Sequence, residues 1–131
     1  MAYIFYGQQL HEMLRDARSA ASRSGAEICG LLVDNCCFIE MIKLRNKTKR
    51  GGGFSYYVDE VRLVRRASRL MAHEIVGTFH SHPCYLAKPG ESDIANAVDD
   101  SLMLIIDVQE QEARLWHIAS GKAGRRRFVT I

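Results

Sequence analysis

The stretch EIVGTFHSHP, from Glu74 to Pro83, determines how the rest of the chain is interpreted. Apolar and β-branched residues followed by a proline are typical of a strand that ends at the proline. Side chains alternate along a strand, so His80 and His82 point to the same face. Two imidazoles at this spacing can bind one metal ion, although an H-x-H pair is also found as two half-exposed histidines. A strand is predicted under both interpretations.

The segments on both sides of this strand alternate between helical and extended patterns. A helix capped by Asp59 is predicted to bury the face that carries Val61, Val64 and Met71. The other predicted helices cover 8–22 and 92–100, and the predicted strands cover 2–6, 25–35, 36–44, 74–82, 102–108, 113–119 and 126–131. This order predicts one mixed α/β domain over residues 1–131, with a central sheet flanked by helices.

Composition and charge exclude several classes of protein. A hydrophobic content of 47% and a charged content of 25% are typical of soluble globular proteins, and 131 residues suffice for a single domain. Eighteen basic against 15 acidic residues give a net charge of +3, which does not indicate a nucleic-acid-binding protein. The basic clusters at Lys43–Arg50 and Gly124–Phe128 are compatible with a solvated loop and a solvated edge strand as well as with a binding patch.

The chain has no feature of an exported or membrane-bound protein. It begins without a basic region followed by a long apolar stretch, so no secretion signal is predicted. The longest apolar run, Leu102–Ile106, is too short to cross a bilayer. The four cysteines have no C-x-x-C spacing and are expected to be reduced thiols. We therefore expect a cytoplasmic protein.

A metal site would need further ligands beyond the two histidines, because a catalytic zinc typically has three protein ligands and one open position. The candidates that follow the strand are Cys84, Glu91, Asp93, Asp99 and Asp100. Asp93 begins a predicted helix after a Pro-Gly loop that can fold back beside the histidines. It is equally explained as a first-turn carboxylate favoured by the helix dipole.

Glu27 is the second unusual residue, because it lies in the apolar stretch AEICGLLV. Burial of a carboxylate is unfavourable unless the group has a partner or a function. In metal-assisted hydrolysis, such a group takes a proton from water and passes it to the leaving group. The alternative is a glutamate at the solvated end of a strand.

The pieces EICGLL, GTFHSHP and KPGESD together resemble the JAB/MPN domain of JAMM-type zinc metalloproteases. That family has a Glu, then His-Ser/Thr-His, seven residues, Ser, two residues and Asp; Glu27, His80, His82 and Asp93 match. The resemblance covers nearly the whole chain and is strongest to prokaryotic single-domain members. It implies a cytidine-deaminase-like mixed sheet and one zinc per chain, held by His80, His82 and Asp93.

The resemblance also implies a function. The expected activity is that of a peptidase or isopeptidase that cleaves at the C-terminal tail of ubiquitin-like or sulfur-carrier proteins. A zinc-bound water would attack the scissile carbonyl with Glu27 as the base. The tail would bind in an extended form along a sheet edge near the metal, by strand addition. Neither a membrane nor a nucleic acid is expected as a partner.

One position departs from the family pattern: Gly90 stands where the family has a serine. That serine supports the bound water or the oxyanion, and loss of one such donor costs on the order of a hundredfold in rate. Ser92 or the Gly90 backbone N–H are candidates to replace it, and Cys84 is expected at the rim of the site. Two alternatives therefore remain: a weak or inactive MPN-like interaction domain and, less favoured, a RadC-like DNA-associated JAB protein.

Overall fold

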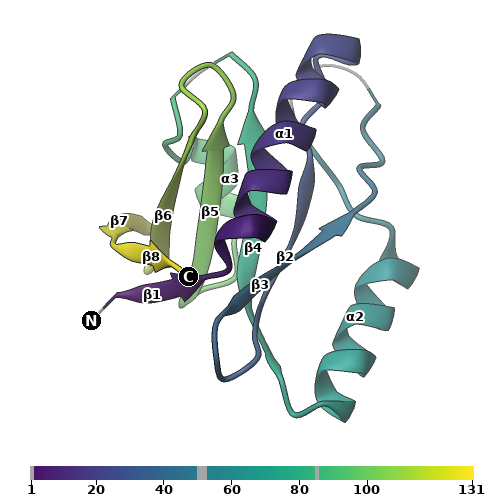
Figure 1. Ribbon diagram of the computed structural model, residues 1–131, viewed down its shortest axis with the longest axis vertical. Coiled ribbons are helices and arrows are strands. Elements are labelled where there is room, and N and C mark those ends of the chain that lie inside the picture. The colour runs from purple at the N-terminus through teal and green to yellow at the C-terminus, as the bar shows by residue number, and fades with distance from the viewer. Residues whose placement is uncertain (1, 50–52, 85) are drawn as a thin grey trace.

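The computed structural model describes residues 2–49, 53–84 and 86–131. Within them, helices flank one eight-stranded sheet with the order β7-β6-β5-β4-β2-β3-β1-β8 (Figure 1). The strands are β1 (Tyr3–Phe5), β2 (Cys29–Asp34), β3 (Ile39–Leu44), β4 (Glu74–His82), β5 (Ser101–Asp107), β6 (Glu112–Ala119), β7 (Lys122–Arg126) and β8 (Phe128–Thr130), and the helices are α1 (Gly7–Ser24), α2 (Val58–Leu70) and α3 (Glu91–Asn96). The prediction of a mixed α/β fold is confirmed.

Strand β4, which carries both histidines, lies in the middle of the sheet. It pairs antiparallel with β2 and parallel with β5, from Gly77 opposite Leu102 to His82 opposite Asp107. Parallel neighbours need a crossover connection, and the segment that contains α3 provides it. This connection carries α3 over the face of the sheet to which the histidines point. Helix α3 ends at Asn96, earlier than predicted.

The sheet has a different core on each face. Helix α1 crosses the near face in Figure 1 and α3 lies behind the sheet. On the α1 side, Leu10, Met13 and Ala17 pack with Leu32, Phe79 and Leu104. On the α3 side, the smaller cluster consists of Ala87, Met103, Ile105 and Ile118. Strand alternation in β4 therefore places Phe79 in the α1 core and both histidines on the opposite face.

Two glycines allow this sheet to pack closely. A Cβ atom on Gly77 would lie 1.9 Å from the carbonyl oxygen of Leu102 in the parallel neighbour. A Cβ atom on Gly30 would lie 2.2 Å from the carbonyl oxygen of Ile42 and 2.4 Å from the ring of Phe79. Any side chain at these positions would push the strands apart, so β4 keeps its place in the sheet only with glycine there.

The end of the chain differs from its prediction. One strand was expected over 126–131, but β7 ends at Arg126 and β8 begins at Phe128. Strand β7 pairs with β6, whereas β8 pairs with β1 at the other edge of the sheet. The sheet curves enough for both edges to approach each other, and Arg127 bridges them by accepting a hydrogen bond from the Tyr3 N–H at 3.2 Å.

Helix α2 also differs in detail. It begins at Val58 with Tyr57 at the N-cap and no side-chain cap, so Asp59 lies in the first turn rather than capping the helix. Its single buried residue is Ser68, and Met71, which was predicted on the buried face, is 63% exposed. The helix therefore rests on the sheet through a narrow contact and leaves most of its surface open to solvent.

No helix of the described residues is long and apolar enough to cross a membrane. All four cysteines are free thiols, of which Cys29 is buried and Cys36, Cys37 and Cys84 are exposed. Burial, followed by the nearby charges of Glu27 and Glu60, raises the pKa of Cys29 to about 12, which keeps this thiol protonated.

Candidate metal centre

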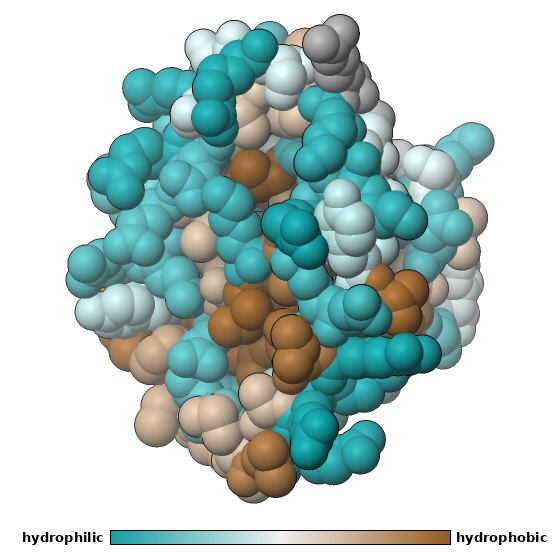
Figure 2. Space-filling view, turned by 90° about the vertical axis from the view of Figure 1, so that its right-hand side faces the viewer, coloured by the Kyte–Doolittle hydropathy of each residue, from teal (hydrophilic) through white to brown (hydrophobic). Residues whose placement is uncertain are grey.

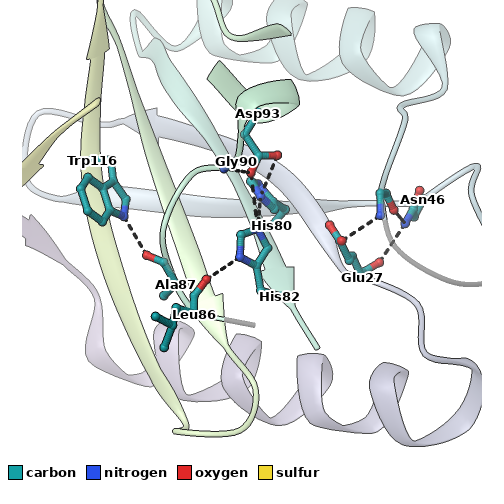
Figure 3. Close-up of polar contacts among 10 residues, drawn as sticks. Glu27, Asn46, His80, His82, Leu86, Ala87, Gly90, Asp93 and Trp116 are labelled. Carbon is teal, nitrogen blue, oxygen red and sulfur yellow. Dashed lines mark hydrogen bonds and ion pairs between the residues drawn. The ribbon is translucent and has the colours of Figure 1, made fainter. Parts of the chain in front are cut away.

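His80, His82 and Asp93 converge on one point, although the aspartate comes from a different element (Figure 3). The two Nε2 atoms lie 3.1 Å apart. Asp93 Oδ1 lies 3.3 Å from His80 Nε2, and Asp93 Oδ2 lies 3.5 Å from His82 Nε2. The structure thus brings together the three residues that were predicted as ligands.

The spacing of these atoms fits a small tetrahedral cation. With bonds of about 2.0–2.1 Å, two ligands of tetrahedral zinc are separated by about 3.3 Å. The two Nε2 atoms are 3.1 Å apart, and they lie 3.3 and 3.5 Å from different oxygens of the Asp93 carboxylate. One donor atom from each residue can be chosen so that all three lie within 4.8 Å of one another. Two imidazoles and one carboxylate are also donors that zinc prefers, and they leave a fourth position open. The donor set therefore fits a zinc ion of the catalytic type.

Asp93 is held as a carboxylate by its surroundings. Burial would raise its pKa, but hydrogen bonds from His80 and His82 outweigh burial and hold the pKa well below its usual range. The Gly90 N–H donates to Asp93 Oδ2 at 2.9 Å and lowers the pKa further. Gly90 is the N-cap of α3, so this bond also closes the first turn of the helix. Asp93 is therefore both a first-turn carboxylate and a member of the cluster.

The ring of His82 is fixed by a bond on its other side. His82 Nδ1 lies 2.7 Å from the Leu86 carbonyl oxygen, which requires a proton on Nδ1. In the protonated ring, Nε2 also carries a proton and donates to Asp93; in the neutral ring, the lone pair is on Nε2 and is available to a metal ion. The residue after Leu86, Ala87, accepts a hydrogen bond from Trp116 Nε1 at 2.9 Å. Burial would lower the pKa of His82, but the bonds to Asp93 and Leu86 outweigh it and raise the pKa.

His80 is held by packing. Its side chain is fully buried, and the ring of Phe54 lies over it with 4.7 Å between centroids. Within residues 2–49, 53–84 and 86–131, His80 Nδ1 has no hydrogen-bond partner. The orientation of this ring thus depends on Phe54 and on the groups that meet its Nε2 atom.

Glu27 is buried, with 4% of its surface exposed, so it is not a glutamate at a solvated strand end. The Gly53 N–H donates to Glu27 Oε2 at 2.8 Å, and the Asn46 side-chain amide donates to the Glu27 backbone carbonyl at 2.9 Å. The next residue is tied to β4: the Ile28 N–H donates to Ser81 Oγ at 2.9 Å. These contacts fix the carboxylate relative to the histidine strand.

The cluster opens into a groove with a volume of about 1070 Å³. It is lined by residues 53–56, by residues of α2 and β4, and by residues of α3 and the segment 97–98 that follows it. Glu27, His82 and Asp93 line it near the end of β4. His117 also lines the groove. It pairs with Leu102, which pairs with Gly77, so it lies level with a position on β4 five residues before His82. The lining therefore extends along β4 from Glu74 to His82.

A family model of prokaryotic homologs of the JAB domain matches residues 8–119. The chain belongs to this family. The match includes Glu27, His80, His82 and Asp93, so the resemblance seen in the sequence is confirmed.

Solved structures show the same fold. This JAB domain is similar to a protein from Desulfitobacterium hafniense (24% identity, 100% of this chain and 93% of that chain covered, TM-score 0.81). It is also similar to a JAB1/MPN domain protein from Archaeoglobus fulgidus (18%, 100% and 99%, 0.61). A third similar structure is described as JAMM, a metalloprotease-like zinc site in the proteasome and signalosome (16%, 98% and 98%, 0.50). At these identities the likeness establishes the fold alone, and no curated protein matches the sequence.

The remaining candidates of this JAB domain lie outside the cluster. Glu91 and Cys84 are exposed, and Cys84 does not line the groove. Asp99 accepts a hydrogen bond from the Ser120 N–H, and Asp100 lies 2.7 Å from His117 Nε2 at the distant end of the groove. Ser92 lines the groove on α3. Of the two candidates for oxyanion support, the Gly90 N–H is already bonded to Asp93.

Four residues that position the site were not assigned from the sequence. Phe54 covers His80, Asn46 and Ser81 hold the segment around Glu27, and Trp116 holds the segment that bonds His82. Ser81 and Ile28 are 53 positions apart, and Trp116 and Ala87 are 29 apart. Contacts at such separations leave no periodic pattern in the sequence. The one available signal is a polar Ser81 on the face of β4 that packs on α1.

Proposed function

We propose that this JAB domain is a zinc-dependent peptidase or isopeptidase that cleaves at the C-terminal tail of ubiquitin-like or sulfur-carrier proteins. The observation that carries the proposal is the spacing of the three donor atoms, beside a buried glutamate and at the end of an elongated groove. Membership of the family supports a hydrolase function. So does the fold shared with a protein described as having a metalloprotease-like zinc site.

His80, His82 and Asp93 would hold the ion, which supplies a Lewis acid for the scissile carbonyl and for water when it is bound. Glu27 accepts a proton from the attacking water and passes it to the leaving amine. The Gly53 N–H fixes one oxygen of this carboxylate, so the geometry of the base is set before substrate arrives. Burial of His80, His82 and Glu27 limits access of bulk water to these groups.

An extended tail fits the groove better than a folded segment does. Strand addition to β4 itself is blocked, because β2 and β5 already pair with both of its edges. Residues 53–57 line or adjoin the groove and form neither a helix nor a strand. The Ser55 N–H donates to Asn46 Oδ1, and the Ser55 carbonyl accepts a hydrogen bond from the Lys47 N–H. The Ser55 bonds do not use the backbone groups of Phe54 and Tyr56, and we expect these groups to pair with an extended tail.

The test is zinc content together with chelator-sensitive cleavage of a sulfur-carrier protein fused through its C-terminal tail to a reporter. We expect close to one zinc per chain, cleavage that a chelator abolishes, and restoration when zinc is added. Glu27→Gln should retain zinc and lose cleavage. If His80→Ala leaves the zinc content unchanged, the metal site is wrong; if Glu27→Gln cleaves like the wild type, the base is wrong.

The second candidate is an interaction domain that retains the metal without cleaving. Gly90 favours it, because the family serine is missing and the backbone N–H at this position is bonded to Asp93. The same fusion assay separates the two functions: such a domain would bind zinc and the tail, and the fusion would stay intact.

A further inference from the structure

Helix α2 carries four arginines on one side. At 3.6 residues per turn, Arg62, Arg65, Arg66 and Arg69 fall within an arc of about 100°. All four are exposed, and within the described parts of the chain none forms an ion pair. Other arginines are paired: Arg45 with Glu60 and Arg114 with Glu112. We call these four residues the arginine stripe.

The stripe begins at the groove that leads to the metal cluster. Val61 and Arg65 line this groove, so one end of the stripe lies at the edge of the groove. The other three arginines lie on the adjoining solvent-exposed surface of α2. Leu63 and Leu70 adjoin the stripe on the side away from Val61, and both are exposed. Figure 2 faces the side of the molecule on which α2 lies and shows hydrophobic side chains gathered there, bordered by hydrophilic ones. The positive charge therefore lies at the groove entrance rather than around the whole helix.

We infer that the arginine stripe docks an acidic surface of the folded protein whose tail enters the groove. This inference rests on the proposed function. Four neighbouring guanidinium groups repel one another, and an opposing set of carboxylates relieves this repulsion while steering the partner to the site. A symmetric pairing of two copies of this chain through the stripe does not fit, since it would place four arginines against four.

A protein fits the surface better than a nucleic acid does. The groove next to the stripe is lined by four carboxylates against two basic side chains, Arg65 and Lys88; the carboxylates belong to Glu27, Glu74, Asp93 and Asp100. A phosphate backbone that followed the groove would meet these negative charges, whereas a neutral peptide tail would not. The acidic part of the partner must therefore bind to the exposed surface of α2, while an uncharged segment of the same partner enters the groove.

The length of the groove predicts where the acidic residues of the partner lie. From His82 back to Gly77 is five residues of strand, or about 17 Å, so about six residues of extended tail separate the cleaved bond from the folded body. Carboxylates are expected upstream of this segment, on the body, and not within the tail.

The test uses two fluorescent peptides with the same neutral six-residue tail, preceded by four glutamates in one and four glutamines in the other. Fluorescence anisotropy with the zinc-loaded protein should give about tenfold tighter binding of the glutamate peptide at low salt. The preference should disappear in high salt. The variant Arg62→Gln, Arg66→Gln and Arg69→Gln should bind both peptides equally and leave binding of the glutamine peptide unchanged.

The control variant removes the same charge at the distant β7 edge: Lys122→Gln, Arg125→Gln and Arg127→Gln. It should keep the preference, and circular dichroism should show that both variants are folded. Equal binding of the two peptides by the wild type, or an equal loss in the control, overturns the inference. The inference is also overturned if oligo-dT binds the wild type more tightly than the glutamate peptide does and loses this affinity in the variant of the arginine stripe. A charge preference without cleavage of any fusion leaves docking intact and removes the proposed hydrolysis.

Discussion

His82 Nδ1 lies 2.7 Å from the carbonyl oxygen of Leu86, and this contact sets which nitrogen of the ring faces the metal cluster. The carbonyl belongs to the segment 86–90, which forms neither a helix nor a strand. Its position depends on Ala87, which is fully buried and bonded to Trp116 on β6. The indole of Trp116 thus orients His82 through the neighbouring backbone carbonyls of Ala87 and Leu86 (Figure 3).

Removal of this indole N–H should therefore weaken metal binding. Trp116→Phe keeps most of the packing and deletes the bond to Ala87. Loss of such supporting contacts typically lowers metal affinity by about 10–100-fold. Competition with a colorimetric chelator should report this decrease, and Tyr6→Phe, which deletes an exposed bond to Gln8, should not change the affinity. Equal affinities for Trp116→Phe and the wild type would contradict the role of Trp116.

The metal-free protein should respond to pH through His82 and Asp93 in opposite senses. The pKa of His82 is raised from 6.5, so its stabilisation is fully present below pH 6.5 and is lost as the pH rises through the folded value. The pKa of Asp93 is lowered from 3.8, so its stabilisation is present above pH 3.8 and is lost only in strong acid. Between pH 5.5 and 8.5 the unfolding free energy of the metal-free protein should fall because of His82.

Urea unfolding with chelator at the two pH values measures this change. His82→Gln should reduce it, while His11→Gln, which alters a histidine outside the cluster, should not. Zinc should reverse the trend, because protons compete with the metal for His82 at low pH. A metal-free protein whose stability rises from pH 5.5 to 8.5 through His82 would contradict the assignment.

Ser81 should matter for both stability and turnover. Its hydroxyl accepts the buried Ile28 N–H, so Ser81→Ala leaves this N–H unpaired at a cost of about 1–3 kcal/mol in the free energy of unfolding. Because Ile28 adjoins Glu27, kcat should fall while zinc content stays the same. Ser24→Ala, at the exposed end of α1, is the control. A variant with lowered stability and unchanged kcat would show that Ser81 supports the sheet but not Glu27.

Local patterns predicted the parts of the site that depend on one element. Alternation in β4 placed His80 and His82 on one face, and the structure confirms it. Asp93 remained ambiguous from its residues alone, because a first-turn carboxylate and a ligand have the same sequence signature. Only the resemblance selected the ligand, and the structure explains the ambiguity: Asp93 bonds Gly90 as a capping residue and meets the histidines as well.

The parts that were missed depend on the three-dimensional path of the chain. The continuous pattern after Arg125 predicted one strand, but curvature of the sheet makes its two edges neighbours and divides the segment at Arg127. Asp59 was expected to cap α2, but Tyr57 precedes the helix instead because the wall of the groove runs directly into it. Both errors arise where a tertiary contact outweighs a local preference.

Gly90 is the position where a substitution should increase activity. Its φ of −83° is accessible to any residue, and an added Cβ would meet only Asp93 Oδ2 at 3.7 Å, so Gly90→Ser should fold without strain. A hydroxyl there adds an oxyanion donor that the bonded N–H does not provide, and we expect kcat for the fusion to rise by up to about a hundredfold. Gly90→Ala is the matched control and should not raise kcat, because it adds the Cβ without the donor. If serine and alanine have equal effects, the missing hydroxyl is not what limits turnover, and Ser92 on the same wall becomes the residue to replace next.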